Sequence, residues 1–372
     1  MRVGLVLGAG GLVGAAWLTG GLEALAGETG WDPSSAEFVV GTSAGSVIGT
    51  TIAAGVPPWL MTAYFLGEDV FEGVEGVEDA WGRPVRKGER RAGSQFGLEG
   101  RLPPIGPGSW RLALSTLRSP RRHPPAALVS GWLPRGVVST QPIKDVVRRT
   151  VPEGWTEHPN LWVVACDYAT GRRTCFGRDD APPADLADAV AASCAIPGFY
   201  HPVLIGGRRY VDGGLWSTSN LDVLRDEGLD LLICLNPTSS LHPPHAWNPL
   251  EWVAGYTRAA SGRRLGSEAR KLRAAGTEVV LIQPALEDLA AMGPNLMSRE
   301  PRERVMRLAR RTVTEQLSAP LVRELLDGLP AGDPDKVRRP SGPPSSWPAP
   351  ADLAARVGPR PEAGERAGGA TA

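Results

Sequence analysis

Five short apolar runs separated by helix-length segments constrain the fold of this chain most. They comprise residues 3–7, 38–40, 161–166, 231–235 and 279–282. Because successive positions are apolar, rather than alternate ones, both faces of each predicted strand should be buried. Strands of this kind, alternating with helices, are typical of a parallel sheet. The sequence therefore predicts an α/β fold, with a mostly parallel central sheet covered by helices on both faces in a three-layer sandwich.

Helices are expected between these runs, and one β-hairpin is expected late in the chain. The helices are predicted at residues 12–26, 47–54, 58–66, 142–150, 184–193, 252–275 and 302–317. The hairpin joins residues 203–205 to residues 209–211 through Gly206 and Gly207, a pair that favours a tight turn. Its second strand leads directly into Asp212.

Composition divides the chain into one large domain over residues 1–330 and a tail over residues 331–372. Of the 42 residues in the tail, 14 are Pro or Gly, which predicts disorder. Within the domain, residues 82–125 hold seven Pro, seven Gly and ten Lys or Arg against two Glu.

Residues 82–125 have two interpretations. The simpler one is a mobile surface excursion with too few apolar residues to pack. The alternative is a lid or a patch for anionic lipid headgroups, because apolar and basic residues alternate there. The residues concerned are Trp110, Arg111, Leu112, Leu114, Leu117 and Arg118.

Charge and cysteine content exclude several classes of function. Lys plus Arg and Asp plus Glu both number 40, so net charge offers no argument for nucleic-acid binding. The four cysteines are widely spaced and form no C-x-x-C pair, which predicts buried, reduced thiols in a cytoplasmic protein and no metal site. No signal peptide and no run of 18 apolar residues is apparent. A soluble protein is expected, with contact to a membrane surface and the oligomeric state left open.

The pentapeptide Gly41-Thr42-Ser43-Ala44-Gly45 follows the second apolar run and precedes a predicted helix. This G-x-S-x-G pattern is typical of a strand-to-helix turn that exposes a nucleophilic serine. The N-terminus of the following helix would direct unpaired N–H groups at the oxyanion formed by attack. Ser43 is therefore a candidate nucleophile, although a Gly-rich turn without function is the alternative in a chain of 46 glycines.

A second glycine-rich turn, residues 8–14, follows the first apolar run. Its backbone N–H groups could bind an oxyanion or a phosphate. A dinucleotide site is the rival interpretation, but Val13 stands where G-x-G-x-x-G requires its third glycine, and no acidic residue follows a second strand at the usual distance.

Asp212 is the candidate general base. It ends a predicted strand and precedes Gly213 and Gly214, so its carboxylate could point into a cleft. An ordinary Asx turn is the alternative.

In this order, the three elements resemble the patatin-like phospholipase family over about residues 2–220. Residues 9–14 match its oxyanion loop, residues 41–45 its nucleophile elbow and residues 212–214 its Asp-Gly-Gly motif, and residues 192–199 match the segment before that motif. Two positions depart from the pattern: Ala9 replaces the first loop glycine, and Val13 replaces a cation.

The resemblance implies a cofactor-independent serine acyl hydrolase that acts on lipid or phospholipid through an acyl-enzyme. Ser43 and Asp212 would form a catalytic dyad, and the N–H groups of Gly10 and Gly11 an oxyanion hole. The supporting glycines would be Gly14, Gly41, Gly45, Gly213 and Gly214.

A Ser-His-Asp triad is the nearest mechanistic alternative. His242 and His245 follow Asp212 in the order that α/β-hydrolases use. However, Ser43 comes after only two predicted strands, which is early for the central elbow of that fold, and both histidines lie in a Pro-rich loop.

Overall fold

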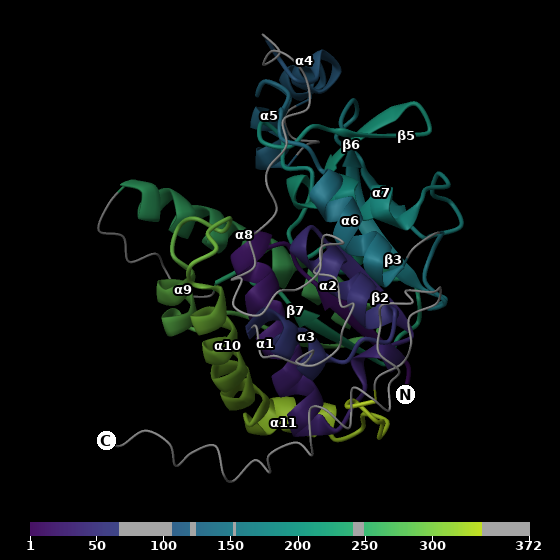
Figure 1. The fold of residues 1–372 in the computed structure, drawn as a ribbon, viewed down its shortest axis with the longest axis vertical. Coiled ribbons are helices and arrows are strands. Elements are labelled where there is room, and N and C mark those ends of the chain that lie inside the picture. Colours follow the sequence, from purple (N-terminus) through teal and green to yellow (C-terminus); the bar gives the residue numbers. More distant parts are fainter. Residues whose placement is uncertain (67–105, 120–123, 152–153, 241–248, 337–372) are drawn as a thin grey trace, which may run out of the picture.

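The protein forms an α/β sandwich around one eight-stranded sheet (Figure 1). The structure is a computed structural model that describes residues 1–66, 106–119, 124–151, 154–240 and 249–336. The strands are β1 (Val3–Leu7), β2 (Phe38–Thr42), β3 (Leu161–Asp167), β4 (Arg173–Phe176), β5 (Val203–Ile205), β6 (Arg208–Asp212), β7 (Leu231–Leu235) and β8 (Glu278–Ile282).

The strand order is β5-β6-β3-β2-β1-β7-β8, and β4 also pairs with β3. Strands β3, β2, β1, β7 and β8 pair in parallel. Strands β4 and β6 run antiparallel to β3, and β5 runs antiparallel to β6. The predicted mostly parallel sheet is confirmed.

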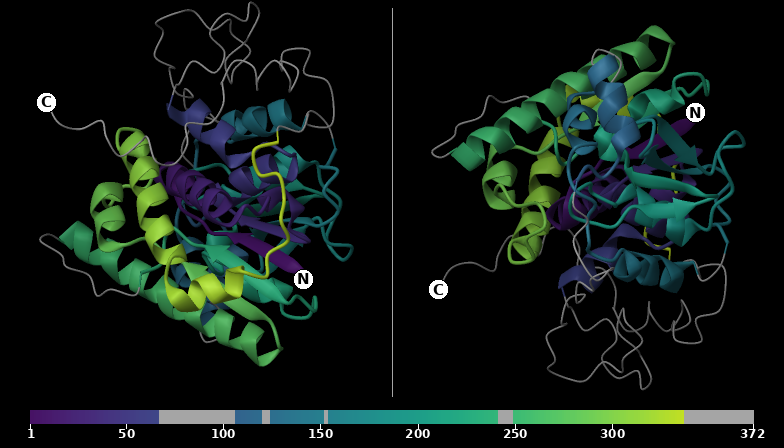
Figure 2. Two further views of the ribbon diagram at one scale, coloured as in Figure 1. Left: turned by 90° about the horizontal axis from the view of Figure 1, so that it is seen from below. Right: turned by 90° about the horizontal axis from the view of Figure 1, so that it is seen from above.

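Side chains of alternate strand residues fill separate apolar clusters on the two faces of the sheet. Leu5 and Leu7 of β1 pack with α1 (Gly11–Thr29), α2 (Ala44–Ala53), α7 (Leu186–Ser193) and α10 (Arg302–Leu317). On the other face, Val6 packs with α8 (Pro249–Ala274) and the 3-10 turn η4 (Leu221–Leu224). Figure 2 shows the sheet between these helices. Burial on both faces explains why the strands are continuously apolar.

The remaining helical segments lie around this core. They are η1 (Pro33–Ser35), α3 (Pro58–Leu66), α4 (Trp110–Arg118), α5 (Pro125–Ser130), α6 (Gln141–Thr150), η3 (Gly213–Leu215), α9 (Leu286–Met292) and α11 (Pro320–Leu326). Within the described ranges, no helix combines the length and the apolar character needed to cross a bilayer.

All seven predicted helices and the hairpin are present, with helix ends within three residues of the prediction. The predicted hairpin turn is confirmed by positive φ angles of 53° at Gly206 and 76° at Gly207. Strand β4 was missed because it is short and carries the polar residues Arg173 and Thr174 among only four positions.

The segment 82–125 differs from its simpler interpretation where it is described. Ser109 accepts a hydrogen bond from the Leu112 backbone N–H and caps α4. The Leu112 and Ala113 side chains are fully buried. Helix α4 therefore packs against the domain. Within the segment 82–125, the structure describes residues 106–119, 124 and 125, and the other residues lie outside the described ranges.

The first residues of the predicted disordered tail, 331–336, also differ from the prediction. The Gly332 N–H donates to the Gly30 carbonyl, and the Trp59 indole N–H donates to the Asp335 carbonyl. Residues 331–336 therefore lie along the domain, while residues 337–372 are outside the described ranges. As predicted, all four cysteines, Cys166, Cys175, Cys194 and Cys234, are buried, and their thiols are free.

Candidate active site

Ser43 occupies a sharp turn between β2 and α2. Its backbone adopts φ 53° and ψ −122°, a conformation that non-glycine residues rarely adopt. A Cβ atom on Gly45 would collide with the Leu7 carbonyl oxygen, and one on Gly41 would collide with the backbone of Ser46. The two glycines of the pentapeptide thus allow α2 to begin directly against the end of β1, and this close packing holds Ser43 in its strained turn.

Ser193, at the end of α7, fixes the backbone of this turn. The Ser43 N–H donates to Ser193 Oγ at 2.8 Å, and the Ser193 hydroxyl donates to the Val164 carbonyl at 2.6 Å. Ser193 therefore ties the elbow to β3. The Ser46 hydroxyl donates to the Ser43 carbonyl at 2.6 Å and holds the turn from its other side.

The register of the sheet brings Asp212 to the elbow. Val164 of β3 pairs with Thr42 of β2, and the next residue, Ala165, pairs with Asp212 of β6. The ends of β2 and β6 consequently meet at neighbouring positions of β3. The Asp212 N–H donates to the Ala195 carbonyl at 3.0 Å, so the segment that fixes Ser43 also fixes Asp212.

The carboxylate of Asp212 is buried, and only 6% of the residue is exposed. Burial raises its pKa to about 6, because loss of solvation penalises the charged form. The Gly214 N–H, which donates to Asp212 Oδ1 at 2.7 Å, and the Ser43 hydroxyl both act in the opposite direction by stabilising the anion. Above pH 6 the site therefore contains a carboxylate beside a serine hydroxyl.

The glycine-rich loop approaches the same place from the N-terminus of α1. Gly10 precedes the helix, and Gly11 has a φ of 60°. Pro237 lies against Gly10 and Gly14. Among the described residues, no acceptor is found for the Gly10 or Gly11 N–H, whereas the Ala9 and Val13 N–H groups donate to Thr218 and Leu296 carbonyls. Within the described part of the chain, both N–H groups therefore lack a protein acceptor at the N-terminus of a helix, where an anion is favoured.

One cavity of about 390 Å³ unites these groups, with Gly10, Gly11, Ser43, Asp212 and Gly214 in its wall. The rest of the wall is mainly apolar. These residues include Ala126, Val129, Leu133, Ile196, Leu215, Leu296 and Met297. A cavity of this kind can hold an apolar chain with one polar group at the serine.

The other predicted residues support this arrangement or lie apart from it. Gly213 lies against the Val164 carbonyl and Thr42, where a side chain would collide. His242 and His245 are outside the described residues. His158 contacts the Ala36 carbonyl at 2.8 Å, and no histidine lines the cavity within the described part of the chain.

Sequence reasoning missed the buried polar residues that support the site. Asn220 donates through Nδ2 to Thr42 Oγ1 at 3.0 Å and to the Ser217 carbonyl at 2.6 Å, so it bridges β2 and the loop after Asp212. Ser193 lies in the segment 192–199 that the sequence analysis had singled out, but its contact with Ser43 depends on the folded chain.

A buried thiol also lies near the site. Cys194 Sγ is 3.9 Å from Ser46 Oγ, and burial raises the pKa of Cys194 to about 12, with the Asp212 charge as a further cause. The thiol is therefore protonated at neutral pH, and this form is a weaker nucleophile than a thiolate. Among the described residues, no group of three or more His, Cys, Asp or Glu side chains could hold a metal ion.

Comparison with protein families gives a match that includes the glycine-rich loop, Ser43 and Asp212. A family model described as patatin-like phospholipase matches residues 5–225, which is more than half of the 372 residues. The matched range begins in β1 and ends just after η4, so it contains the glycine-rich loop, the serine elbow and the aspartate.

Proposed function

This chain belongs to the patatin-like phospholipase family, whose members are lipid acyl hydrolases, and we propose that it cleaves fatty-acyl esters with Ser43 and Asp212 as a catalytic dyad. The observation that carries the proposal is that the Ser43 hydroxyl, held by a strained backbone turn, lies beside the buried Asp212 carboxylate in a cavity with mainly apolar walls.

In the first step, Asp212 accepts the proton of the Ser43 hydroxyl as Oγ attacks the ester carbonyl carbon. The carbonyl oxygen becomes an oxyanion and accepts hydrogen bonds from the N–H groups of Gly10 and Gly11. Because both donors belong to the backbone at the start of α1, they are oriented before the substrate arrives. As the intermediate collapses, the C–O bond to the leaving alcohol breaks, protonated Asp212 returns its proton to the alcohol oxygen, and the acyl group remains on Ser43.

In the second step, Asp212 takes a proton from water as the water oxygen attacks the acyl-enzyme. Asp212 then returns this proton to Ser43 Oγ as the bond between Oγ and the acyl carbon breaks and the fatty acid leaves. The raised pKa of Asp212 assists both steps, because a carboxylate with a pKa of about 6 is a stronger base than one with the usual value of about 3.9. Only the ionised form can accept the proton, so kcat/KM should fall as the pH decreases through 6.

The substrate class follows from the cavity walls. Val129, Ile196 and Leu296 offer an apolar surface to the acyl chain, and burial of each CH₂ group contributes about 0.8 kcal/mol. We therefore expect KM to fall as the acyl chain lengthens from acetyl to octanoyl.

The test combines a fluorophosphonate probe, which labels activated serines, with hydrolysis of p-nitrophenyl acyl esters in metal chelator. Ser43→Ala should abolish both reactions, and Asp212→Asn should lower kcat by about 10²–10⁴-fold, the usual contribution of a general base. Ser318→Ala serves as the control, because this exposed hydroxyl donates to the Thr314 carbonyl at 2.9 Å at the end of α10 and is absent from the cavity wall. It should retain probe labelling.

The double variant His242→Ala/His245→Ala distinguishes the dyad from a triad. Full activity in this variant is expected for a dyad, whereas loss of activity in a folded protein would replace the dyad with a histidine mechanism. Micromolar binding of NAD, NADP or ATP in calorimetry would contradict the role assigned to the glycine-rich loop.

A further inference from the structure

Helix α4 turns apolar side chains outward. Trp110, Leu114 and Leu117 are 60%, 46% and 65% exposed, and their spacing places them in one stripe along the helix. Another side of α4, which carries Leu112, Ala113 and Thr116, is buried against the domain. A helix that needed only to cover the core would carry polar residues on its outer side.

The outward stripe continues onto α5 and the turn after it. Trp132 contacts Trp110 edge to face, with ring centroids 6.4 Å apart. Val129 and Leu133 are exposed as well and also line the Ser43 cavity. We call these six side chains the α4–α5 surface: Trp110, Leu114, Leu117, Val129, Trp132 and Leu133. This surface therefore leads from solvent to the candidate catalytic serine.

Positive charge accompanies the α4–α5 surface. The described residues 106–119 and 124–140 include three Arg and no Asp or Glu, although the whole chain is neutral. On α4, Arg111 and Arg118 are exposed, and their spacing places them beside the apolar stripe. An apolar stripe next to a cationic one is typical of helices that lie at the surface of anionic membranes.

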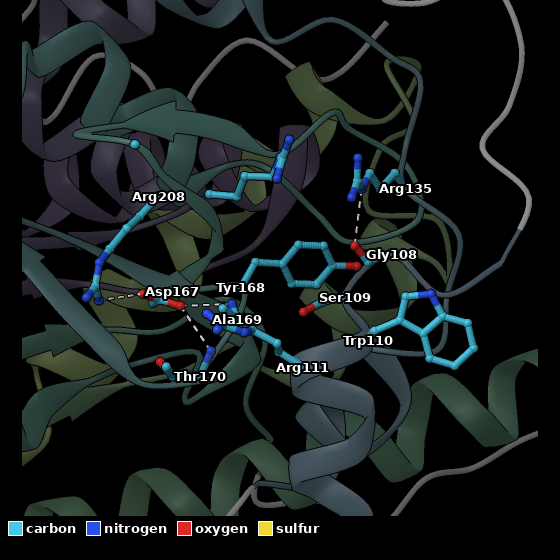
Figure 3. A pocket seen from close by; sticks show the side chains of 12 residues that line it. Gly108, Ser109, Trp110, Arg111, Arg135, Asp167, Tyr168, Ala169, Thr170 and Arg208 are labelled. Carbon is cyan, nitrogen blue, oxygen red and sulfur yellow. Dashed lines mark hydrogen bonds and ion pairs between the residues drawn. The ribbon is translucent and has the colours of Figure 1, made fainter.

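A second cavity of about 410 Å³ opens on the arginine side of α4 and is lined by Arg111, Arg135, Arg208 and Arg209 (Figure 3). Its acidic residue, Asp167, is already engaged, because it accepts from Arg208 at 3.1 Å and from the Ala169 and Thr170 N–H groups. The cavity therefore presents a net positive charge, which suits a phosphate group.

These features lie at one end of the molecule. Figure 1 shows α4, α5 and the β5–β6 hairpin together at the end opposite α11. Exposed apolar patches on soluble domains mark sites of interaction. Tryptophan is favoured at the level of lipid headgroups, and arginine is attracted to anionic lipids. An anionic bilayer therefore matches the α4–α5 surface in both its apolar and its charged parts.

We propose that the α4–α5 surface docks this chain on an anionic lipid bilayer, with the two tryptophans at headgroup level and the arginines of the second cavity on lipid phosphates. Val129 and Leu133, which belong to both the surface and the Ser43 cavity, would then guide an acyl chain from the membrane to the serine. That route rests on the proposed function, whereas the docking itself does not.

The test is co-flotation of the full chain carrying Ser43→Ala, so that no lipid is hydrolysed. Vesicles of phosphatidylcholine alone are compared with vesicles containing about one quarter phosphatidylglycerol. We expect binding to the anionic vesicles that weakens steeply with salt. The further change Arg111→Ala/Arg118→Ala should lower the partition coefficient by roughly 20–30-fold, since each arginine near such a surface contributes about fivefold.

A matched pair of variants tests the location. Leu117→Ala/Arg118→Ala should weaken binding, whereas Leu321→Ala/Arg323→Ala should not, because α11 offers an equally exposed leucine and arginine at the far end. Without the Ser43 change, both variants should hydrolyse a short-chain soluble ester at the normal rate, which shows that they are folded. No binding by the unchanged surface, or equal loss in both variants, would overturn the proposal.

Two further outcomes separate this inference from the proposed function and from a free anion. If the protein docks on vesicles but hydrolyses no ester, the docking proposal stands and the catalytic proposal is wrong. If it hydrolyses esters but does not dock, the catalytic proposal stands and the docking proposal is wrong. If the protein binds inorganic phosphate in calorimetry but floats with neither kind of vesicle, the arginine cavity selects a free phosphate and the docking proposal is wrong.

Discussion

The serine elbow and the α4–α5 surface make opposite use of burial. At the elbow, Ser43 and Asp212 are both nearly inaccessible, and packing forces a strained backbone and a raised carboxylate pKa. On α4, Trp110 and Leu117 remain exposed beside solvated arginines. The proposed reactivity thus belongs to a region from which the fold excludes water, and the proposed membrane contact belongs to a region where the fold leaves apolar groups in water.

The two regions should also differ in how substitutions affect stability and function. The elbow depends on backbone atoms that approach each other too closely for any added side chain, so it should be intolerant of change in stability as well as activity. The part of the α4–α5 surface outside the Ser43 cavity, Trp110, Leu114, Leu117 and Trp132, contributes little to the core. Substitutions there should leave the fold intact and alter only membrane binding.

The largest expected effect is at the elbow. Gly45→Ala should lower the free energy of unfolding by more than about 3 kcal/mol, because its Cβ would collide with the rigid Leu7 carbonyl. Gly266→Ala is the matched control on α8, where the nearest atom to an added Cβ is Arg270 Nη1 at 3.8 Å. The control should gain up to about 1 kcal/mol from helix propensity. Urea denaturation measures both, and equal stability of the two variants would contradict the packing argument.

Helix α4 contains both a fully buried leucine, Leu112, and an exposed one, Leu117. Leu112→Ala should destabilise the fold by about 3 kcal/mol, because it leaves a cavity in the core. Leu117→Ala, two turns from the start of the same helix, should change stability by less than about 0.5 kcal/mol, since the side chain is 65% exposed. Thermal unfolding of the pair measures the difference. Similar losses in both would mean that the outer stripe of α4 is covered in the folded protein.

The smallest expected effect is the response of stability to pH. Because the folded-state pKa of Asp212 is about 6 against a reference value of 3.8, the folded protein binds this proton more tightly than the unfolded chain does. The free energy of unfolding should therefore fall as the pH rises from about 4 to about 6 and stay lower above this range.

Asp212→Asn removes this penalty. At about pH 7.5, the free energy of unfolding of the variant should exceed that of the parent by on the order of 2–3 kcal/mol. This difference should vanish below about pH 4. Asp180→Asn, whose side chain is 72% exposed, should show no such pH-dependent difference. Denaturation of all three proteins across the pH range checks the sign, and a less stable Asp212→Asn variant at neutral pH would show that the carboxylate is not destabilised by burial.

Local signals were sufficient for seven of the eight strands in the described residues and for the two glycine-rich turns. The runs at β1 and β7 were predicted to the residue, and the pentapeptide around Ser43 forms the expected strand-to-helix turn. Strand β4 was missed, since its pairing partner β3 and not its own composition makes it a strand. The packing of α4 was missed for a similar reason, because only the folded domain supplies the surface that buries Leu112.

The sequence by itself determined which chemical groups the chain carries and in what order: a loop of free backbone donors, a serine in an elbow and an aspartate after a hairpin. Periodicity and glycine placement encode such features locally. The tertiary structure alone decided that β3 holds Thr42 and Asp212 at neighbouring positions, that Ser193 fixes the elbow, that burial raises the Asp212 pKa, and that one side of α4 faces water. These properties depend on strand register and on exclusion of solvent by residues distant in the chain, which no local pattern specifies.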